Sequence, residues 1–417
     1  MHKKLKKLLH KIGPGVVTGA SDDDPSGIAT YSLAGASQGY GLLWTSFLTF
    51  PLMAAIQEMC ARIGLVTGKG LAGNIKAHYK SKILLYSLGF LFVIATSINI
   101  GADLAGMSAA LNLLIPLNPI VSNLLIAGLI ITLLVYFPYK FIVARLKWLT
   151  FALFAYIASA VVTQQDWGQI ILRAFVPKFS LSSDYLVFIV AILGTTISPY
   201  LFFWQTSEEV EEVKEEEKIS HRKIIVTKHE LKVAKEDVQI GMLFSNIVMF
   251  AIIATTASTL FAAGINDIQT ASDAARALEP IAGKASSLLF TLGIVGTGLL
   301  AIPVLAGSAG YAVSEIFGWK EGLSYKFRQA KSFYLVIIFS TILGLFITLI
   351  NINPFKALFY TAVVYGLISP ILILFILLLA NSKKVMGKYT NTRVTNILGI
   401  LTLAVMSAAA IGFFATL

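Results

Sequence analysis

The chain contains a single cysteine among 417 residues, and this excludes a disulfide framework and a CxxC metal site. Cys60 stands in an apolar run, where a small buried apolar residue is its ordinary role. Charged residues are also scarce, because only 13% of the chain is charged while 56% is hydrophobic. A soluble protein of this length needs far more charge to cover its surface. The sequence therefore predicts an integral membrane protein.

Several catalytic signatures are missing as well. His229-Glu230 lacks the second histidine of an HExxH zinc motif, and the sequence has neither a glycine-rich phosphate loop nor a nucleophile elbow. ATP-driven transport and intramembrane proteolysis lose their support, so we predict neither an enzyme nor a cofactor. The net charge of +11 comes from short basic segments between apolar runs rather than from one groove-sized face. We therefore expect no nucleic-acid partner.

Eleven apolar segments of roughly 18 to 28 residues recur along the chain, each long enough to cross a hydrocarbon core about 30 Å thick. No alternating strand pattern appears, so the predicted fold class is an all-α integral membrane protein with eleven transmembrane helices. The segments are residues 14–40, 41–67, 82–114, 119–139, 148–164, 185–206, 238–264, 285–313, 332–351, 355–380 and 392–416.

The basic residues predict the orientation. If the N-terminus is cytoplasmic, 28 of the 33 lysines and arginines fall in cytoplasmic segments. We therefore expect the N-terminus on the cytoplasmic side of the cell membrane and the C-terminus on the outer side. Residues 1–13 begin like a signal peptide, but three consecutive aspartates follow where its apolar core should be. We expect a retained basic cytoplasmic tail.

Two of the apolar segments contain helix-breaking sequence. Residues 19–27 read GASDDDPSG, and residues 194–200 read GTTISPY. Proline removes a backbone donor, and exposed main chain in mid-membrane is tolerated only around a cavity. The breaks fall in segments one and six, the pattern of an inverted-repeat transporter with its site at the bilayer midplane. We predict a first five-helix repeat at 14–164, a second at 185–380 and an eleventh helix at 392–416.

Carboxylates inside a membrane span are costly and usually functional. Asp24 precedes the first proline, where its carboxylate and the freed carbonyls favour an oxygen-rich cation site, although a helix cap is the alternative. Asp103 is predicted to line the ion path, against the alternative of a hydrogen-bonded buried acid. Asp22 and Asp23 are predicted to form a vestibule that attracts cations.

Hydroxyl and histidine side chains complete this inventory. Thr195 and Ser198 are three residues apart at the second break and can face one cavity, although membrane hydroxyls usually bond their own backbone. None of the predicted spans contains a histidine, so a proton relay through a membrane histidine is excluded. The charged loop 207–237 is interpreted as a solvated helical extension, with a metal-sensing or regulatory cluster as the alternative. The five histidines are His2, His10, His78, His221 and His229.

The motifs resemble those of one transporter family. Asp24-Pro25-Ser26-Gly27, the segment from Ala61 to Lys69, the segment around Asp103 and Leu367-Ile368-Ser369-Pro370 are similar to helices of the Nramp divalent-metal transporters. The resemblance spans nearly the whole chain and implies the LeuT-type fold of inverted five-helix repeats with broken helices one and six.

The departures from the family pattern indicate a branch. Gly27 stands where the family has its metal-binding Asn, Ser198 where it has its metal-binding Met, and Tyr200 in place of a His. Without the soft thioether ligand, the site loses its preference for soft cations over hard ones. This pattern is similar to that of the Nramp-related magnesium transporters. The resemblance implies a largely hydrated ion and no proton coupling. The implied metal-site residues are Asp24, Gly27, Thr195, Ser198 and Asp103.

The first prediction is therefore an uncoupled transporter that takes up Mg²⁺ and Mn²⁺ through the lipid bilayer by alternating access, with a monomer as the plausible state. One alternative is a proton-coupled Mn²⁺ or Fe²⁺ transporter of the Nramp type, with Asp103 and Asp24 carrying the proton. Another is a membrane metal sensor that signals through loop 207–237. An amino-acid symporter of the same fold is disfavoured, because three aspartates at the break would repel a carboxylate.

Overall fold

The computed structural model describes residues 13–79, 81–137, 141, 149–163, 165–177, 179–220, 226–350 and 352–415. These residues form helices joined by short loops, and none of them is in a strand. The helices are α2 (Pro14–Asp22), α3 (Pro25–Gln38), η1 (Gly39–Leu42), α4 (Trp44–Thr67), α5 (Leu71–His78), α6 (Lys82–Leu111), α7 (Pro119–Tyr136), η2 (Leu149–Leu153), α9 (Phe154–Val162), α10 (Trp167–Phe175), α11 (Ser183–Thr196), α12 (Pro199–Ser220), α13 (Lys228–Thr256), η3 (Ala257–Phe261), α14 (Ala271–Arg276), α15 (Glu279–Ala282), η4 (Gly283–Ala285), α16 (Ser286–Phe317), α17 (Lys331–Thr348), α18 (Pro354–Asn381), α19 (Lys383–Met386) and α20 (Arg393–Ala415).

The all-helical prediction is confirmed for this part of the chain, whereas the number of spans is not. Among the described residues, eight helices are long and apolar enough to cross a membrane, or nine if the pair Pro25–Leu42 and Trp44–Thr67, bent by 107°, is counted. The first predicted span is broken into pieces of 9 and 14 residues, and part of the fifth lies outside the described residues. Eleven spans therefore stay a prediction.

Both predicted helix breaks are present. α2 ends at Asp22 and α3 begins at Pro25, while α11 ends at Thr196 and α12 begins at Pro199. α2, which precedes the first break, packs against α12, which follows the second break. α3, which follows the first break, packs against α11, which precedes the second. The two broken helices therefore run antiparallel, which is the arrangement that inverted repeats require.

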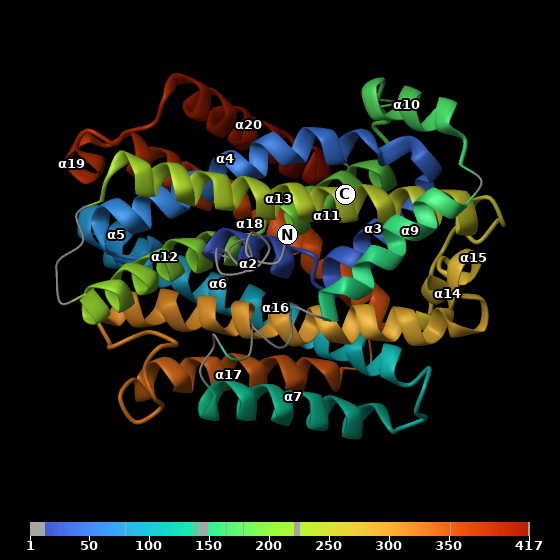
Figure 1. The fold of residues 1–417 in the computed structure, drawn as a ribbon, viewed down its shortest axis with the longest axis horizontal. Helices are drawn as coiled ribbons and strands as arrows, with labels where there is room; N and C mark the ends of the chain where they lie inside the picture. The colour runs from blue at the N-terminus through green and yellow to red at the C-terminus, as the bar shows by residue number, and fades with distance from the viewer. Residues whose placement is uncertain are drawn as a thin grey trace, which may run out of the picture.

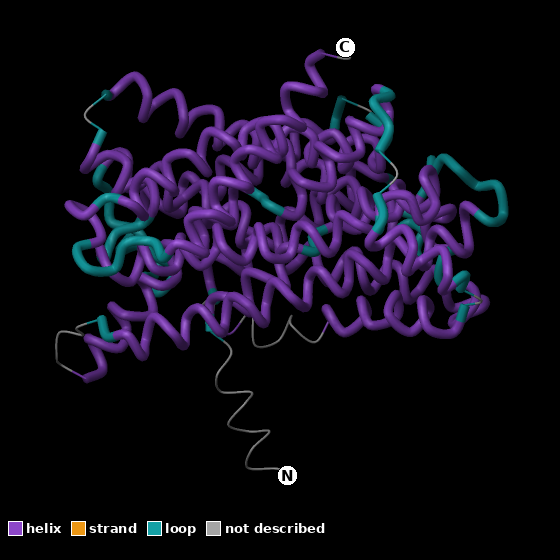
Figure 2. Tube along the Cα trace, turned by 90° about the horizontal axis from the view of Figure 1, so that it is seen from above, coloured by secondary structure: helices purple, strands orange, loops and turns teal. Residues whose placement is uncertain are grey.

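The helices that support the breaks are paired in the same way. α2 packs along α13, and α12 packs along α4, so each broken helix has one half held by a long helix of the other part of the chain. In Figure 1 these long helices run nearly parallel across the molecule. Figure 2 shows most loops gathered at the two ends of this bundle, with only short non-helical stretches inside it.

The contact between α2 and α13 is made backbone to backbone. A Cβ added to Gly19 would lie 2.2 Å from the carbonyl oxygen of Gly241, so neither position accommodates a side chain without moving a helix. At the end of the same contact, Asp237 of α13 accepts hydrogen bonds from the amides of Gly13 (3.2 Å), Gly15 (2.6 Å) and Val16 (3.3 Å). Asp237 thereby caps the start of α2 and fastens it to α13.

The two ends of the bundle carry different short helices. α5 and α19 lie at the left end in Figure 1, and α10, α14 and α15 lie at the right end. The sequence places the segments around α5 and α19 on one side of the membrane and those around α10 and α14 on the other, and the structure agrees with this grouping. Which end faces the cytoplasm stays a prediction from the lysine and arginine bias.

Candidate functional site

The site is built around Asp24, in the gap between α2 and α3. Its Oδ1 accepts hydrogen bonds from the amide of Gly27 (2.8 Å) and the hydroxyl of Ser26 (2.6 Å). Asp24 is thus the N-cap of α3, where Pro25 takes the first helical position and loses no needed donor. Only 1% of the residue is exposed. The capping role weighed in the sequence analysis is therefore real, and it orients the carboxylate.

A residue that the sequence analysis did not single out holds the other oxygen of this carboxylate. Asn99 of α6 donates a hydrogen bond of 3.0 Å to Asp24 Oδ2. Asp103 lies one helical turn further along α6 and is fully buried. The spacing of four residues between Asn99 and Asp103 was the signal available in the sequence, because it places both side chains on one face of a helix.

The second break contributes a hydroxyl to the same place. Thr195, near the end of α11, has its Oγ1 3.4 Å from the Oγ of Ser26. A Cβ added to Gly27 would lie 3.3 Å from both Thr195 Oγ1 and the carbonyl oxygen of Asp22. The structure therefore brings Asp24, Gly27 and Thr195 together around one point between the two breaks.

Ser198 is placed differently from this group. Its hydroxyl donates to the carbonyl oxygens of Gly194 (3.0 Å) and Thr195 (2.6 Å), so it closes the end of α11. The carbonyl of Ile197 in the same break accepts a hydrogen bond of 2.9 Å from Ser369 of α18. In this conformation three carbonyl groups of the second break accept hydrogen bonds from protein hydroxyls.

Two tyrosines tie the breaks to each other. Tyr200 of α12 donates a hydrogen bond of 2.8 Å to the carbonyl of Ser21 in α2. Tyr31 of α3 and Thr196 of α11 lie 3.1 Å apart through their hydroxyls. The Tyr200–Ser21 hydrogen bond joins α12 to α2, and the Tyr31–Thr196 contact joins α3 to α11. The site between the two breaks is therefore enclosed from both sides.

Asp22 and Asp23 lie next to Ser245 of α13. Both aspartates are 0% exposed, and the Ser245 hydroxyl lies 2.6 Å from Asp22 Oδ2 and 3.2 Å from Asp23 Oδ1. Their carboxylates are therefore in the buried layer between α2 and α13, a position that the sequence could not show. The cation-attracting vestibule expected from this pair stays a prediction.

Many buried oxygen atoms around the breaks accept no hydrogen bond. Within the described residues, the unpartnered buried atoms include Asp22 Oδ1, Asp23 Oδ2, Asn99 Oδ1 and both oxygens of Asp103. An unpaired acceptor in a low-dielectric interior is costly, and a bound cation or water is the usual explanation. No three acidic, histidine or cysteine side chains of the described part converge on one point. The donor set thus suits a cation that keeps part of its water, held by one or two carboxylates.

The charged block after the second break is helical as far as Ser220, which agrees with a helical extension of α12. It is not fully solvated, however. Glu209 is 3% exposed and accepts a hydrogen bond of 2.9 Å from Gln205, and Val210 is 5% exposed. The first turns of the predicted loop 207–237 therefore belong to the packed end of the bundle.

Comparisons with known proteins agree with this arrangement. A family model described as natural resistance-associated macrophage protein-like, or Nramp, matches residues 15–416. The divalent metal cation transporter MntH of Caldanaerobacter subterraneus subsp. tengcongensis is 24% identical over 405 residues, covering 95% of this chain and 91% of that protein. MntH of Klebsiella pneumoniae strain 342 is 26% identical over 432 residues, covering 97% of this chain and 93% of that protein.

Solved structures show the same fold. The manganese transporter of Eremococcus coleocola, in complex with an aromatic bis-isothiourea substituted compound, superposes with a TM-score of 0.75 at 20% identity, covering 100% of this chain and 88% of that chain. Mhp1, a nucleobase-cation-symport-1 family transporter in a closed conformation, gives a TM-score of 0.51 at 11% identity, covering 97% of this chain and 92% of that chain.

Proposed function

The chain belongs to the Nramp family of membrane transporters, and from this premise we propose that it carries Mn²⁺, with Asp24 as the central ligand. The names of its relatives, divalent metal cation and manganese transporters, favour the manganese alternative of the sequence analysis over its magnesium-first prediction. One observation carries the proposal. A capped, buried carboxylate lies between two antiparallel broken helices, among oxygen atoms that lack donors.

Alternating access follows from the pairing of the broken halves. α2 and α12 pack together near one end, and α3 and α11 near the other. Parting the first pair would open the site to one side, and parting the second would open it to the opposite side. The hydrogen bond from Tyr200 to Ser21 and the Tyr31–Thr196 contact are the links that each opening has to break.

Uptake into the cell is the direction that the physics favours. An interior negative by 100 mV favours entry of a dication by about 4.6 kcal/mol, twice the value for one elementary charge. We place the protein in the cell membrane with its N-terminus in the cytoplasm, as the lysine and arginine bias predicts. The cation is the cargo, and the bilayer is the only other partner that the proposal requires.

Magnesium is a second candidate cargo, because the groups around Asp24 are hard oxygen donors. They include the hydroxyl of Ser26, 2.6 Å from Asp24 Oδ1, and the hydroxyl of Thr195, 3.4 Å from the Oγ of Ser26. In liposomes that contain the purified protein, we expect Mn²⁺ influx that millimolar Mg²⁺ slows by competition, and no special preference for Cd²⁺. Influx of each ion is followed with an entrapped indicator. Strong Cd²⁺ transport together with indifference to Mg²⁺ would show that the site has soft character and would remove magnesium from the proposal.

Coupling to protons is tested separately. Ile100, which cannot titrate, stands where the resemblance to the Nramp transporters implies an acidic residue of a proton route, and Tyr200 stands where it implies a His. We therefore expect metal influx without acidification of the liposome interior, measured with a pH dye in the same vesicles. Making the interior negative should still accelerate influx, because net charge moves with the dication. Metal-dependent acidification that disappears in an Asp103→Asn variant would instead establish the proton-coupled alternative.

A further inference from the structure

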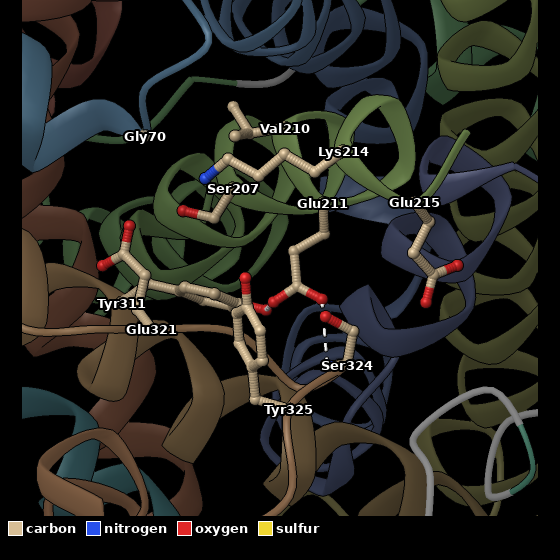
Figure 3. A pocket seen from close by; sticks show the side chains of 10 residues that line it. All are labelled: Gly70, Ser207, Val210, Glu211, Lys214, Glu215, Tyr311, Glu321, Ser324 and Tyr325. Carbon is tan, nitrogen blue, oxygen red and sulfur yellow. Dashed lines mark hydrogen bonds between the residues drawn. The ribbon is translucent and has the colours of Figure 1, made fainter. Parts of the chain in front are cut away.

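A second polar cavity lies away from the helix breaks, at the end of the bundle that carries α5. It has a volume of about 40 Å³ and lies between α12, the end of α16 and the loop that joins α16 to α17 (Figure 3). Gly70, the residue before α5, forms part of its wall. At roughly 10–15 Å³ for each water, this space holds an ion with a few water molecules.

Three carboxylates from three different elements lie at or beside this cavity: Glu211 and Glu321 line it, and Glu315 adjoins its wall at Gly70. Glu211 of α12 accepts hydrogen bonds from the hydroxyl of Tyr311 (2.6 Å) and the amide of Leu323 (2.7 Å). Glu315 of α16 accepts one from the amide of Gly73 in the first turn of α5 (2.9 Å). Glu321, in the loop after α16, is the third. Glu211 and Glu315 are thus held in place by the chain around them.

Two oxygens at the cavity have no hydrogen-bond partner. They are the Oγ of Ser207, a residue only 4% exposed, and the Oε2 of Glu321. A Cβ added to Gly70 would lie 2.6 Å from Ser207 Oγ and 2.4 Å from Glu315 Oε1. The Ser207 hydroxyl and the Glu315 carboxylate therefore both lie next to Gly70. Figure 3 shows the Glu321 carboxylate and the Ser207 hydroxyl on the same side of the cavity.

The acidic side chains at the cavity outnumber the basic ones. Among the described lining residues Lys214 is the one basic side chain, and its charge acts on both Glu315 and Glu321, but it stands against the three lining acids Glu211, Glu215 and Glu321. Burial and the charge of Glu315 raise the pKa of Glu321 to about 9. Two nearby cations are directed elsewhere, since Lys76 donates to the backbone carbonyl of Glu315 and Lys320 lies 4.1 Å from the ring centre of Tyr325.

We propose that this cavity is a second divalent-cation site, in which Glu315, Glu321 and Ser207 hold a partly hydrated Mn²⁺ or Mg²⁺. The proposal rests on the proposed function only for the identity of the cation. Two carboxylates, a hydroxyl and retained waters are an ordinary set of ligands for a hard dication. Because the ligands come from α12, α16 and the following loop, a bound cation would fasten α12 to its neighbours and hold this end of the transporter closed.

The test measures Mn²⁺ binding to the purified full-length protein by the loss of the free-ion EPR signal. An Asp24→Asn variant weakens the central site and keeps a side chain that can cap α3. We expect this variant to retain one bound Mn²⁺ per chain, and the double variant Asp24→Asn/Glu321→Gln to bind that ion about tenfold more weakly. Hydrogen exchange of residues 318–330 should slow on adding Mn²⁺ to the single variant only.

The matched control is Asp24→Asn/Glu236→Gln, which removes an acid from an exposed i,i+4 pair on α13. It should bind Mn²⁺ as the single variant does. Equal Mn²⁺ binding with and without Glu321, or no binding to the single variant, would overturn the second site. Failure of the proposed function would appear elsewhere, as unimpaired transport by Asp24→Asn, and would leave this binding result unchanged.

Discussion

Replacing Asp24 with Asn is expected to reduce metal influx by about 100-fold or more while leaving the fold intact. An amide oxygen can still accept the hydrogen bond from Gly27, so the N-cap of α3 survives. The charge is lost, however, and the cation then meets only neutral oxygens after shedding part of its water. Influx into liposomes measures the loss, and elution from a sizing column confirms the fold. An Asp24→Ala variant should lose both the ligand and the cap.

Asp166 offers a matched control for this experiment. It caps α10, and its carboxylate accepts a hydrogen bond of 2.9 Å from the amide of Gln169, in the same way as Asp24 accepts one from Gly27. Asp166→Asn should therefore transport normally. If Asp24→Asn also transports normally, the carboxylate at position 24 acts only as a cap and the central site is wrong.

Replacing Gly194 with Ala is expected to have a comparably large effect, through packing rather than through the ion. A Cβ at this position would lie 2.0 Å from the carbonyl oxygen of Ala362 and 2.3 Å from the amide nitrogen of Gly366, both in the backbone of α18. Backbone cannot turn aside as a flexible side chain can, so α11 has to shift away from α18. We expect a loss of about 3 kcal/mol in the free energy of unfolding.

The measurement is the temperature at which the purified variant loses its monodisperse elution peak. Gly128→Ala is the matched control, because Gly128 is also in an apolar helix, α7, but a Cβ there would meet nothing within 4 Å. That variant should be as stable as the unmodified protein. Equal stability of the two variants would show that α11 and α18 are less closely packed than the structure indicates.

The breaks in the helices could be predicted from sequence because proline acts locally. Pro25 and Pro199 each begin a helix in the structure, and the non-helical residues before them are those that the sequence identified. The number of spans was harder to predict, since a broken helix divides its apolar length into pieces that are individually too short. Which halves pack together is a property of the tertiary structure, and no local pattern shows it.

The site was predicted in type rather than in detail. The cost of a membrane carboxylate pointed to Asp24 and Asp103, but the direction of a hydroxyl depends on competition with nearby carbonyls. Ser198 therefore bonds to its own helix, while Thr195 approaches Ser26. Asn99 is harder to identify from sequence, because an amide carries no charge and only its spacing of four residues from Asp103 indicates that it faces the site. Its hydrogen bond to Asp24 comes from a helix that is distant in the sequence.

The fastening of α2 to α13 by Asp237 limits the ways in which this end of the molecule can move. The Asp237 carboxylate accepts three amide hydrogen bonds from the start of α2, and the backbones of Gly19 and Gly241 are in direct contact. A displacement of α2 relative to α13 would have to break these contacts, whereas a movement that carries α13 along with α2 keeps them. We therefore expect α2 and α13 to move as one rigid unit during alternating access.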